Sequence, residues 1–157
     1  MKILNSVLLC LVCSSSALAQ TTESLSPFEL RGSGGWIGFP DDSMIHHGLV
    51  GASLRISAGR FGVEPELTYM IGPGDDRDVV LAPVISWEFG GTRVRPYVLG
   101  AAGVLWHHAY GSWGKEFIAS FGFGVRTQIT RRWSVSPELR IGMWPHLAVK
   151  VAVGYRF

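Results

Sequence analysis

The stretch that decides the fold is Leu147–Phe157, LAVKVAVGYRF. Every second residue is apolar, and the residues between them are small or charged, a period of two that is typical of a β-strand with one apolar face. The run is about as long as the ~9–11 residues that a tilted strand needs to cross a bilayer. In a soluble sheet such an edge promotes aggregation. In a membrane barrel both of its edges are paired and its apolar face contacts lipid.

The first residues have the pattern of a secretory signal peptide. Lys2 supplies a positive start, Val7–Val12 is an apolar core, and Ala17–Ala19 is a small-residue cleavage site. The sequence therefore predicts a signal peptide over 1–19 and one mature domain over 20–157, a length that suits a single domain.

Charge and cysteine content restrict the function of the mature chain. Cleavage removes only Lys2 among the charged residues, so the formal net charge falls from +2 to about +1. A net charge this small does not indicate the excess of positive charge that is typical of proteins that bind nucleic acids. Cys10 and Cys13 lie in the expected signal peptide, so we expect neither disulfides nor thiol chemistry. No run of 18 apolar residues follows it, which argues against a helical membrane protein.

Seven further segments read as strands, so that eight are expected in all: 28–39, 48–57, 61–71, 79–89, 93–106, 117–127, 133–143 and 147–157. The expected links alternate, with long ones at 40–47, 72–78 and 107–116 and short ones elsewhere. In outer-membrane barrels long loops are extracellular and short turns periplasmic, so both chain ends are expected in the periplasm. The predicted fold is all-β: a single eight-stranded antiparallel up-and-down transmembrane β-barrel.

The polar faces of the strands indicate which side meets lipid. An Arg or Lys facing lipid near the bilayer midplane costs about 2–4 kcal/mol, whereas charges of both signs inside the barrel can pair. We therefore predict a lumenal charge network that contains Arg55, Glu64, Glu66, Glu88, Arg95, Arg126, Glu138, Arg140, Lys150 and Arg156. Glycines blur the alternation in 28–39 and in the later part of 93–106, so the facing of these two strands stays open.

Aromatic residues gather near the expected strand ends, as in the interfacial girdles of membrane barrels. Four tryptophans lie toward the long links, and a second group lies toward the short turns: Trp36, Trp106, Trp113 and Trp144, then Trp87, Phe89, Trp133, Tyr155 and Phe157. Four prolines oppose regular central strands, and we expect them at bulges or strand ends: Pro65, Pro83, Pro96 and Pro137.

The chain resembles the small outer-membrane β-barrel superfamily, the group that contains the OmpA transmembrane domain and the OmpX-like and OmpW-like proteins. The resemblance rests on the signal peptide, the eight amphipathic strands and the closing octet Lys150–Phe157. That octet looks like the C-terminal assembly signal of the family, although the family usually has Gly where Ala152 stands. The resemblance implies that Tyr155 and Phe157 contribute to recognition by the barrel-assembly machinery.

The histidines lie on or beside the expected long links: His46, His47, His107, His108 and His146. Paired imidazoles on two loops, with Asp41 or Asp42, are suitable ligands for Zn²⁺ or Cu²⁺. Polar rim positions also tolerate histidine, and adjacent residues of a strand point to opposite sides. We therefore expect no metal and no cofactor, and keep the five histidines as candidate ligands.

The sequence favours a non-catalytic outer-membrane protein with an envelope structural or surface-interaction role. Its expected partners are outer-membrane lipids, the barrel-assembly machinery and an extracellular ligand that the sequence does not identify. The alternative is a small-solute or ion pore, although an eight-stranded lumen is just wide enough to be filled by side chains. A lipid A-modifying enzyme is a third possibility. The His-x-Ser arrangement of lipid A deacylases is absent, and Ser112 near His107 or His108 is the nearest substitute.

Overall fold

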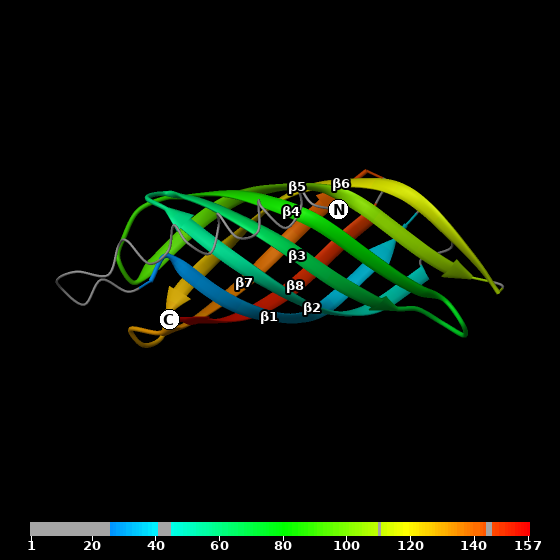
Figure 1. Cartoon of the computed structure of the whole chain (residues 1–157), viewed down its shortest axis with the longest axis horizontal. Coiled ribbons are helices and arrows are strands. Elements are labelled where there is room, and N and C mark those ends of the chain that lie inside the picture. Colours follow the sequence, from blue (N-terminus) through cyan, green and yellow to red (C-terminus); the bar gives the residue numbers. More distant parts are fainter. Residues whose placement is uncertain (1–25, 41–44, 110, 144–145) are drawn as a thin grey trace, which may run out of the picture.

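The computed structural model is a closed barrel of eight antiparallel strands in sequence order (Figure 1). It describes residues 26–40, 45–109, 111–143 and 146–157. The strands are β1 Phe28–Phe39, β2 Ile45–Ala58, β3 Phe61–Ile71, β4 Arg77–Glu88, β5 Val94–Ala109, β6 Ser112–Gln128, β7 Trp133–Gly142 and β8 His146–Arg156. Each strand pairs with its neighbours in the chain, and β1 pairs with β8 to close the sheet. The predicted fold class is confirmed.

The two ends of the barrel differ in what they carry. The end that holds the start of β1 and the finish of β8 is called the terminal end, and the opposite end the distal end (Figure 1). Distal links span 40–44, 72–76, 110–111 and 143–145, and terminal-end links span 59–60, 89–93 and 129–132. The predicted contrast between long and short links is therefore wrong. The predicted signal peptide, Asp41, Asp42 and Trp144 lie outside the described residues.

The largest error in the strand boundaries is at the hairpin between β5 and β6. Residues 107–116 were expected to form a loop because they are polar and rich in glycine. Instead the two strands pair as far as Ala109↔Ser112. Gly111 has a φ of +76°, a left-handed conformation that suits glycine and permits so tight a reversal. β2 also begins earlier than expected, at Ile45, which places His46 and His47 in a strand rather than a loop.

The exterior of the barrel is apolar and the interior is charged, the reverse of a soluble protein. Leu54, Leu67 and Val151 are 37%, 51% and 47% exposed, whereas Arg55 and Arg126 are each 1% exposed. Strand alternation produces this separation because successive side chains point to opposite faces of the sheet. The outer face is thus suited to contact with acyl chains. Among the described residues, no helix is long and apolar enough to cross a membrane.

Outward-facing aromatic side chains pack in pairs at both ends of the barrel. At the terminal end the Phe61 and Trp87 rings meet edge to face, with centroids 4.3 Å apart. There Tyr155 packs between Trp133 and Phe157, at centroid distances of 5.0 and 5.6 Å. At the distal end Trp36 and Trp113 are exposed. Paired aromatics at two levels correspond to the girdles expected at the two membrane interfaces.

The prolines are accommodated without bulges. Three lie in strand interiors and the fourth near the start of β5: Pro65, Pro83, Pro137 and Pro96. At the first, the ladder passes from Ser53↔Glu66 directly to Ile56↔Val63, so two pairs are missing while the register is unchanged. Equivalent gaps occur in the β4–β5 and β6–β7 ladders. The expectation of bulges or strand ends is therefore wrong for the interior prolines, because losing one N–H donor interrupts a ladder without shifting it.

Candidate functional site

The middle of the lumen is crossed by a buried arginine that joins two strands. Arg31 of β1 donates from Nη1 to both carboxylate oxygens of Glu64, at 2.8 and 2.6 Å, and from Nη2 to Oε1 of Glu138 at 3.0 Å. Glu64 also accepts a hydrogen bond from Ser53, and Glu138 accepts one from the Tyr97 hydroxyl at 2.7 Å. Both oxygens of Glu64 and Oε1 of Glu138 thus accept hydrogen bonds from these donors, as a buried charge requires.

A second set of ion pairs extends this crossing toward the distal end. Arg140 donates to both oxygens of Glu66, at 3.0 and 2.9 Å, and from Nη2 to Oε2 of Glu138 at 2.7 Å. Lys150 Nζ donates to Glu66 Oε2 at 2.7 Å. Together with Arg31 and Glu64 the set contains three cations and three anions. None of these six side chains is more than 8% exposed, so they fill the cross-section of the lumen.

Toward the terminal end, one carboxylate serves three arginines. Glu88 Oε1 accepts from Arg55 Nη2 at 2.8 Å and from Arg126 Nη1, and its Oε2 accepts from Arg95 Nη1 at 3.0 Å. Glu88 is 4% exposed. It is therefore the principal anion that compensates the positive charge in this part of the barrel.

A further acidic group at the terminal end of the lumen is Glu29, near the start of β1. It accepts hydrogen bonds from Ser134 Oγ at 2.9 Å and from Arg156 Nη2 at 3.2 Å. Glycines make room for these long side chains, because a Cβ at Gly62 would occupy the position of the Arg55 guanidinium and one at Gly154 that of the Glu29 carboxylate. Small residues therefore alternate with charged ones along the lumen.

The structure places all ten residues of the predicted charge network inside the barrel and in ion pairs. Sequence reasoning missed Glu29 and Arg31, because the glycines of β1 left its facing open. The signal that finds them is the pairing partner: Glu29 lies opposite both Arg55 and Arg156, whose facing the sequence did indicate.

An apolar layer closes the lumen on the distal side of the charges. It consists of inward-facing side chains from six strands, each at most 8% exposed: Ile37, Leu49, Met70, Leu105, Ile118 and Ala148. A cavity of about 60 Å³ is lined by residues of this layer, by the Glu66–Arg140–Lys150 group and by His146. This volume exceeds the roughly 10–15 Å³ that a single water molecule needs. The apolar layer separates the charge network from the distal mouth.

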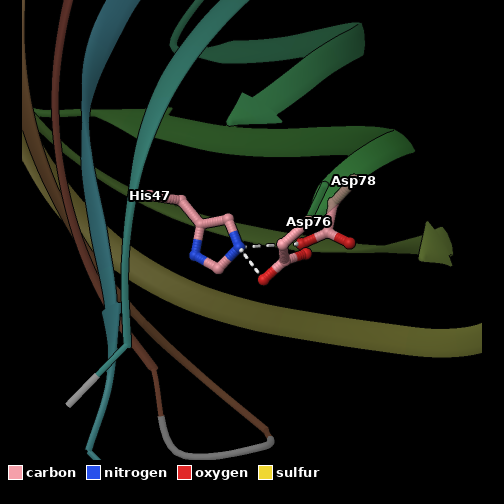
Figure 2. A group of neighbouring side chains, drawn as sticks. All are labelled: His47, Asp76 and Asp78. Carbon is pink, nitrogen blue, oxygen red and sulfur yellow. Dashed lines mark hydrogen bonds and ion pairs between the residues drawn. The ribbon is translucent and has the colours of Figure 1, made fainter. Parts of the chain in front are cut away.

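Beyond the apolar layer, histidine and aspartate side chains converge at the distal mouth. His47 Nε2 lies 2.9 Å from Asp76 Oδ2 and 3.6 Å from Asp78 Oδ2 (Figure 2). His107 Nδ1 lies 2.5 Å from Asp78 Oδ1 and 3.6 Å from Asp76 Oδ1. We call these four residues the distal cluster. Three strands and the link before β4 supply it, and nitrogen and oxygen atoms of this kind can share a proton or a metal ion.

The remaining histidines do not join the distal cluster. His46 packs on Trp36 with ring centroids 5.2 Å apart, and His108 packs on Trp113 at 4.9 Å. His108 Nδ1 also lies 3.3 Å from the Asp75 carbonyl oxygen. His146 is buried beside Phe39, and its Nδ1 lies 3.1 Å from the Met143 carbonyl oxygen. The structure thus brings together one member of each adjacent histidine pair.

Comparisons with known proteins agree with this architecture. The Neisserial surface protein A structure matches with a TM-score of 0.75 at 11% identity, over 86% of this chain and 100% of that one. The N-terminal β-barrel domain of Pseudomonas aeruginosa OprF matches with a TM-score of 0.59 at 19% identity, over 85% and 100%. The outer membrane enzyme PagL matches with a TM-score of 0.59 at 15% identity, over 81% and 98%.

Sequence comparison adds no closer relative. No protein-family model matches the chain, and no curated protein matches it. At these identities the structural matches establish the fold alone. The predicted resemblance to the small outer-membrane β-barrels is confirmed at that level.

Proposed function

We propose that the chain is a non-catalytic outer-membrane protein whose barrel is a closed support for a structural or surface-interaction role. The observation that carries this proposal is the filled lumen. Six paired charges cross its middle, and the apolar layer covers them on the distal side. A conducting pore needs a continuous path for water and ions, and buried ion pairs that satisfy one another oppose such a path.

The distal rim is the part of this support that is suited to contacts. Residues 112–117 of β6 are exposed on both faces of the strand, so the β5–β6 hairpin projects beyond the wall of the barrel. Trp113 and Phe117 are 62% and 60% exposed within it. Aromatic side chains are enriched where proteins bind one another. In this proposal the distal end is extracellular, the terminal end is periplasmic, and the ligand of the hairpin is a surface partner.

Export and assembly complete the proposal. A signal peptide over 1–19 directs the chain across the inner membrane. The barrel-assembly machinery then recognises the C-terminal end of the chain, where Tyr155 of β8 packs against Phe157, the residue that follows the strand. Outer-membrane lipids contact the apolar exterior, and a nucleic acid partner is excluded from the proposal because the net charge is small.

The charged lumen favours the alternative of a small-solute or ion pore. A pore conducts ions across a bilayer and a closed barrel does not, so a conductance measurement distinguishes the two. We expect no stepwise conductance when the refolded chain is inserted into a planar bilayer. A triple variant that replaces Arg31, Glu64 and Glu138 by Ala shortens three crossing side chains while keeping the local charge nearly balanced, and it should conduct. Stepwise conductance by the unmodified chain at the level of the triple variant contradicts a closed barrel.

The alternative of a lipid-modifying enzyme is favoured by the structural match to PagL. Nucleophilic catalysis needs a histidine that accepts a proton from a hydroxyl or thiol. A carboxylate orients such a histidine, and His47 and His107 do contact aspartates, while His108 contacts a backbone carbonyl; none of these contacts is to a hydroxyl. We therefore expect the mass spectrum of lipid A to be the same in Gram-negative cells that express the chain, its Ser112→Ala variant or neither. Loss of an acyl chain with the unmodified protein alone contradicts the non-catalytic role.

A further inference from the structure

We propose that the distal cluster is a binding site for a divalent transition metal ion of the zinc class. His47, Asp76 and Asp78 each offer one ligand atom, and these atoms lie within 4.8 Å of one another (Figure 2). His107 approaches the same two carboxylates from β5. The cluster therefore offers one imidazole nitrogen and two carboxylate oxygens close together, and a second imidazole nitrogen on the other oxygens of the same two carboxylates.

The spacing of these atoms is close to that of a tetrahedral site. Zinc binds His nitrogen and Asp oxygen at about 2.0–2.2 Å, so neighbouring ligand atoms in a tetrahedron lie about 3.3 Å apart. His47 Nε2 lies 2.9 and 3.6 Å from the Oδ2 atoms of Asp76 and Asp78. His107 Nδ1 lies 3.6 and 2.5 Å from their Oδ1 atoms, so each histidine meets the two carboxylates at about this spacing. Binding of both histidines to one ion requires rotation of the His107 ring or of the carboxylates, because the two histidines contact different oxygens of Asp76 and Asp78.

The charges of the cluster favour a cation. Asp76 and Asp78 are two residues apart and present their carboxylates to the same histidines. The Oδ1 atom of Asp76 is buried and has no hydrogen-bond partner within the described part of the chain. A divalent ion beside two carboxylates and two neutral imidazoles gives a neutral assembly, and it satisfies this acceptor. Neutrality matters here because an uncompensated charge is costly away from water.

The surroundings hold the ligands in place. The His47 ring is 3% exposed and meets the Phe39 ring edge to face at 5.4 Å. A Cβ at Gly72 would overlap both the His47 ring and the Asp76 carboxylate, so glycine leaves room for them. Arg77 Nη1 donates to the Gly72 and Asp76 carbonyl oxygens, which fixes the link that carries Asp76. Packing that restricts ligand rotamers is typical of metal sites.

The route to the cluster runs from the distal surface. The side chains of His107 and Asp76 are 41% and 17% exposed, whereas those of His47 and Asp78 are 3% exposed. The apolar layer lies beneath, with Leu49 and Leu105 two residues from His47 and His107 along their strands. An ion therefore enters from outside the barrel and does not continue into the lumen.

The ligand set selects the class of metal. Ca²⁺ takes six to eight oxygen ligands, and Mg²⁺ prefers oxygen and retains its waters. Imidazole with carboxylate suits Zn²⁺, and also Cu²⁺ and Ni²⁺, through a borderline-soft nitrogen. Bound in this position, the ion joins β2, β4 and β5 at the mouth of the barrel. We therefore expect a structural ion that stabilises the packing of these strands at the distal end.

The test is titration of Zn²⁺ into the refolded chain, prepared without a polyhistidine tag, by calorimetry in detergent micelles. We expect one ion per chain, which elemental analysis after dialysis should also find. His107→Gln and Asp76→Asn alter partly exposed ligands and should weaken binding at least about tenfold. The matched controls are His46→Gln and His108→Gln, which change the histidines adjacent to ligands and should alter affinity less than twofold. Heat-modified gel mobility verifies folding of each variant.

Three outcomes overturn the proposal. The first is the absence of heat and of bound zinc with the unmodified chain. The second is binding that His107→Gln and Asp76→Asn leave unchanged, or that the two control variants weaken equally. The third is displacement of Zn²⁺ by an equal concentration of Ca²⁺, which would assign the carboxylates to a different class of ion.

Discussion

Replacing Glu88 by glutamine is expected to lower the free energy of unfolding by about 3–5 kcal/mol, the cost of removing one partner of a buried ion pair. Three arginines share this carboxylate, and its loss leaves Arg126 with only the longer contact to Glu29, at 3.9 Å, and removes the carboxylate that pairs with Arg55 and Arg95. Glutamine keeps the size of the side chain, but its amide group presents donors to guanidinium groups that are donors themselves. The loss is therefore electrostatic and leaves no cavity.

The measurement is a urea titration of the barrel in lipid vesicles, with folding followed by heat-modified gel mobility. Glu116→Gln is the matched control, because it removes the same charge from an exposed position in the β5–β6 hairpin and should change the free energy by less than about 0.5 kcal/mol. The double variant Glu88→Gln with Arg126→Gln should recover part of the loss, since it removes one stranded cation. Equal stability of Glu88→Gln and Glu116→Gln contradicts a central role for Glu88.

Long uninterrupted alternation made much of the fold predictable. β3 has the boundaries that the sequence indicated, 61–71, because bulky and polar residues alternate along it without a break. The same parity places Glu64 and Glu66 in the lumen. A charge in the lumen has partners and a charge in lipid has none. The energetic cost of an unpaired charge therefore indicates that the polar face of each strand points into the lumen and the apolar face toward lipid.

In glycine-rich stretches the sequence does not predict which side chains face the lumen. In β1, Gly32, Gly34 and Gly35 present no side chain to either face, so a period of two carries no contrast there. Yet β1 supplies Arg31, which joins Glu64 to Glu138. Its importance depends on partners 33 and 107 residues away in the chain, and such pairing becomes visible only when the sheet closes.

The distal cluster shows how strand boundaries limit site prediction. The sequence predicts loops at 40–47, 72–78 and 107–116, and in a loop adjacent histidines and the two aspartates have no defined facing. Extending the parity of β2 from Arg55 selects His47 over His46. Extending that of β5 from Arg95 selects His107 over His108. The alternation of each strand therefore identifies the inward-facing histidine of each pair, provided that the strand is extended to include it. The sequence does not indicate this extension, because polar residues near a strand end resemble those of a loop.

Replacing Leu67 by arginine is expected to cost about 2–4 kcal/mol, and replacing Ile71 by arginine about 0–1 kcal/mol. Both residues lie on the outer face of β3, with exposed fractions of 51% and 46%, so contacts within the protein do not distinguish them. Leu67 lies near the middle of the strand and Ile71 at its distal end. The difference arises from the bilayer, because a guanidinium near the midplane is far from water and one at the interface reaches it.

Urea titration of the two variants in the same vesicles measures this difference. Leu67→Ala is the control for the lost side chain, and its cost should be smaller than that of Leu67→Arg. A barrel that exposes β3 to water would accept arginine equally at both positions, since neither side chain is packed inside the protein. Unequal costs therefore require a medium that changes with depth along the strand, and equal costs contradict the assignment of the apolar exterior to lipid.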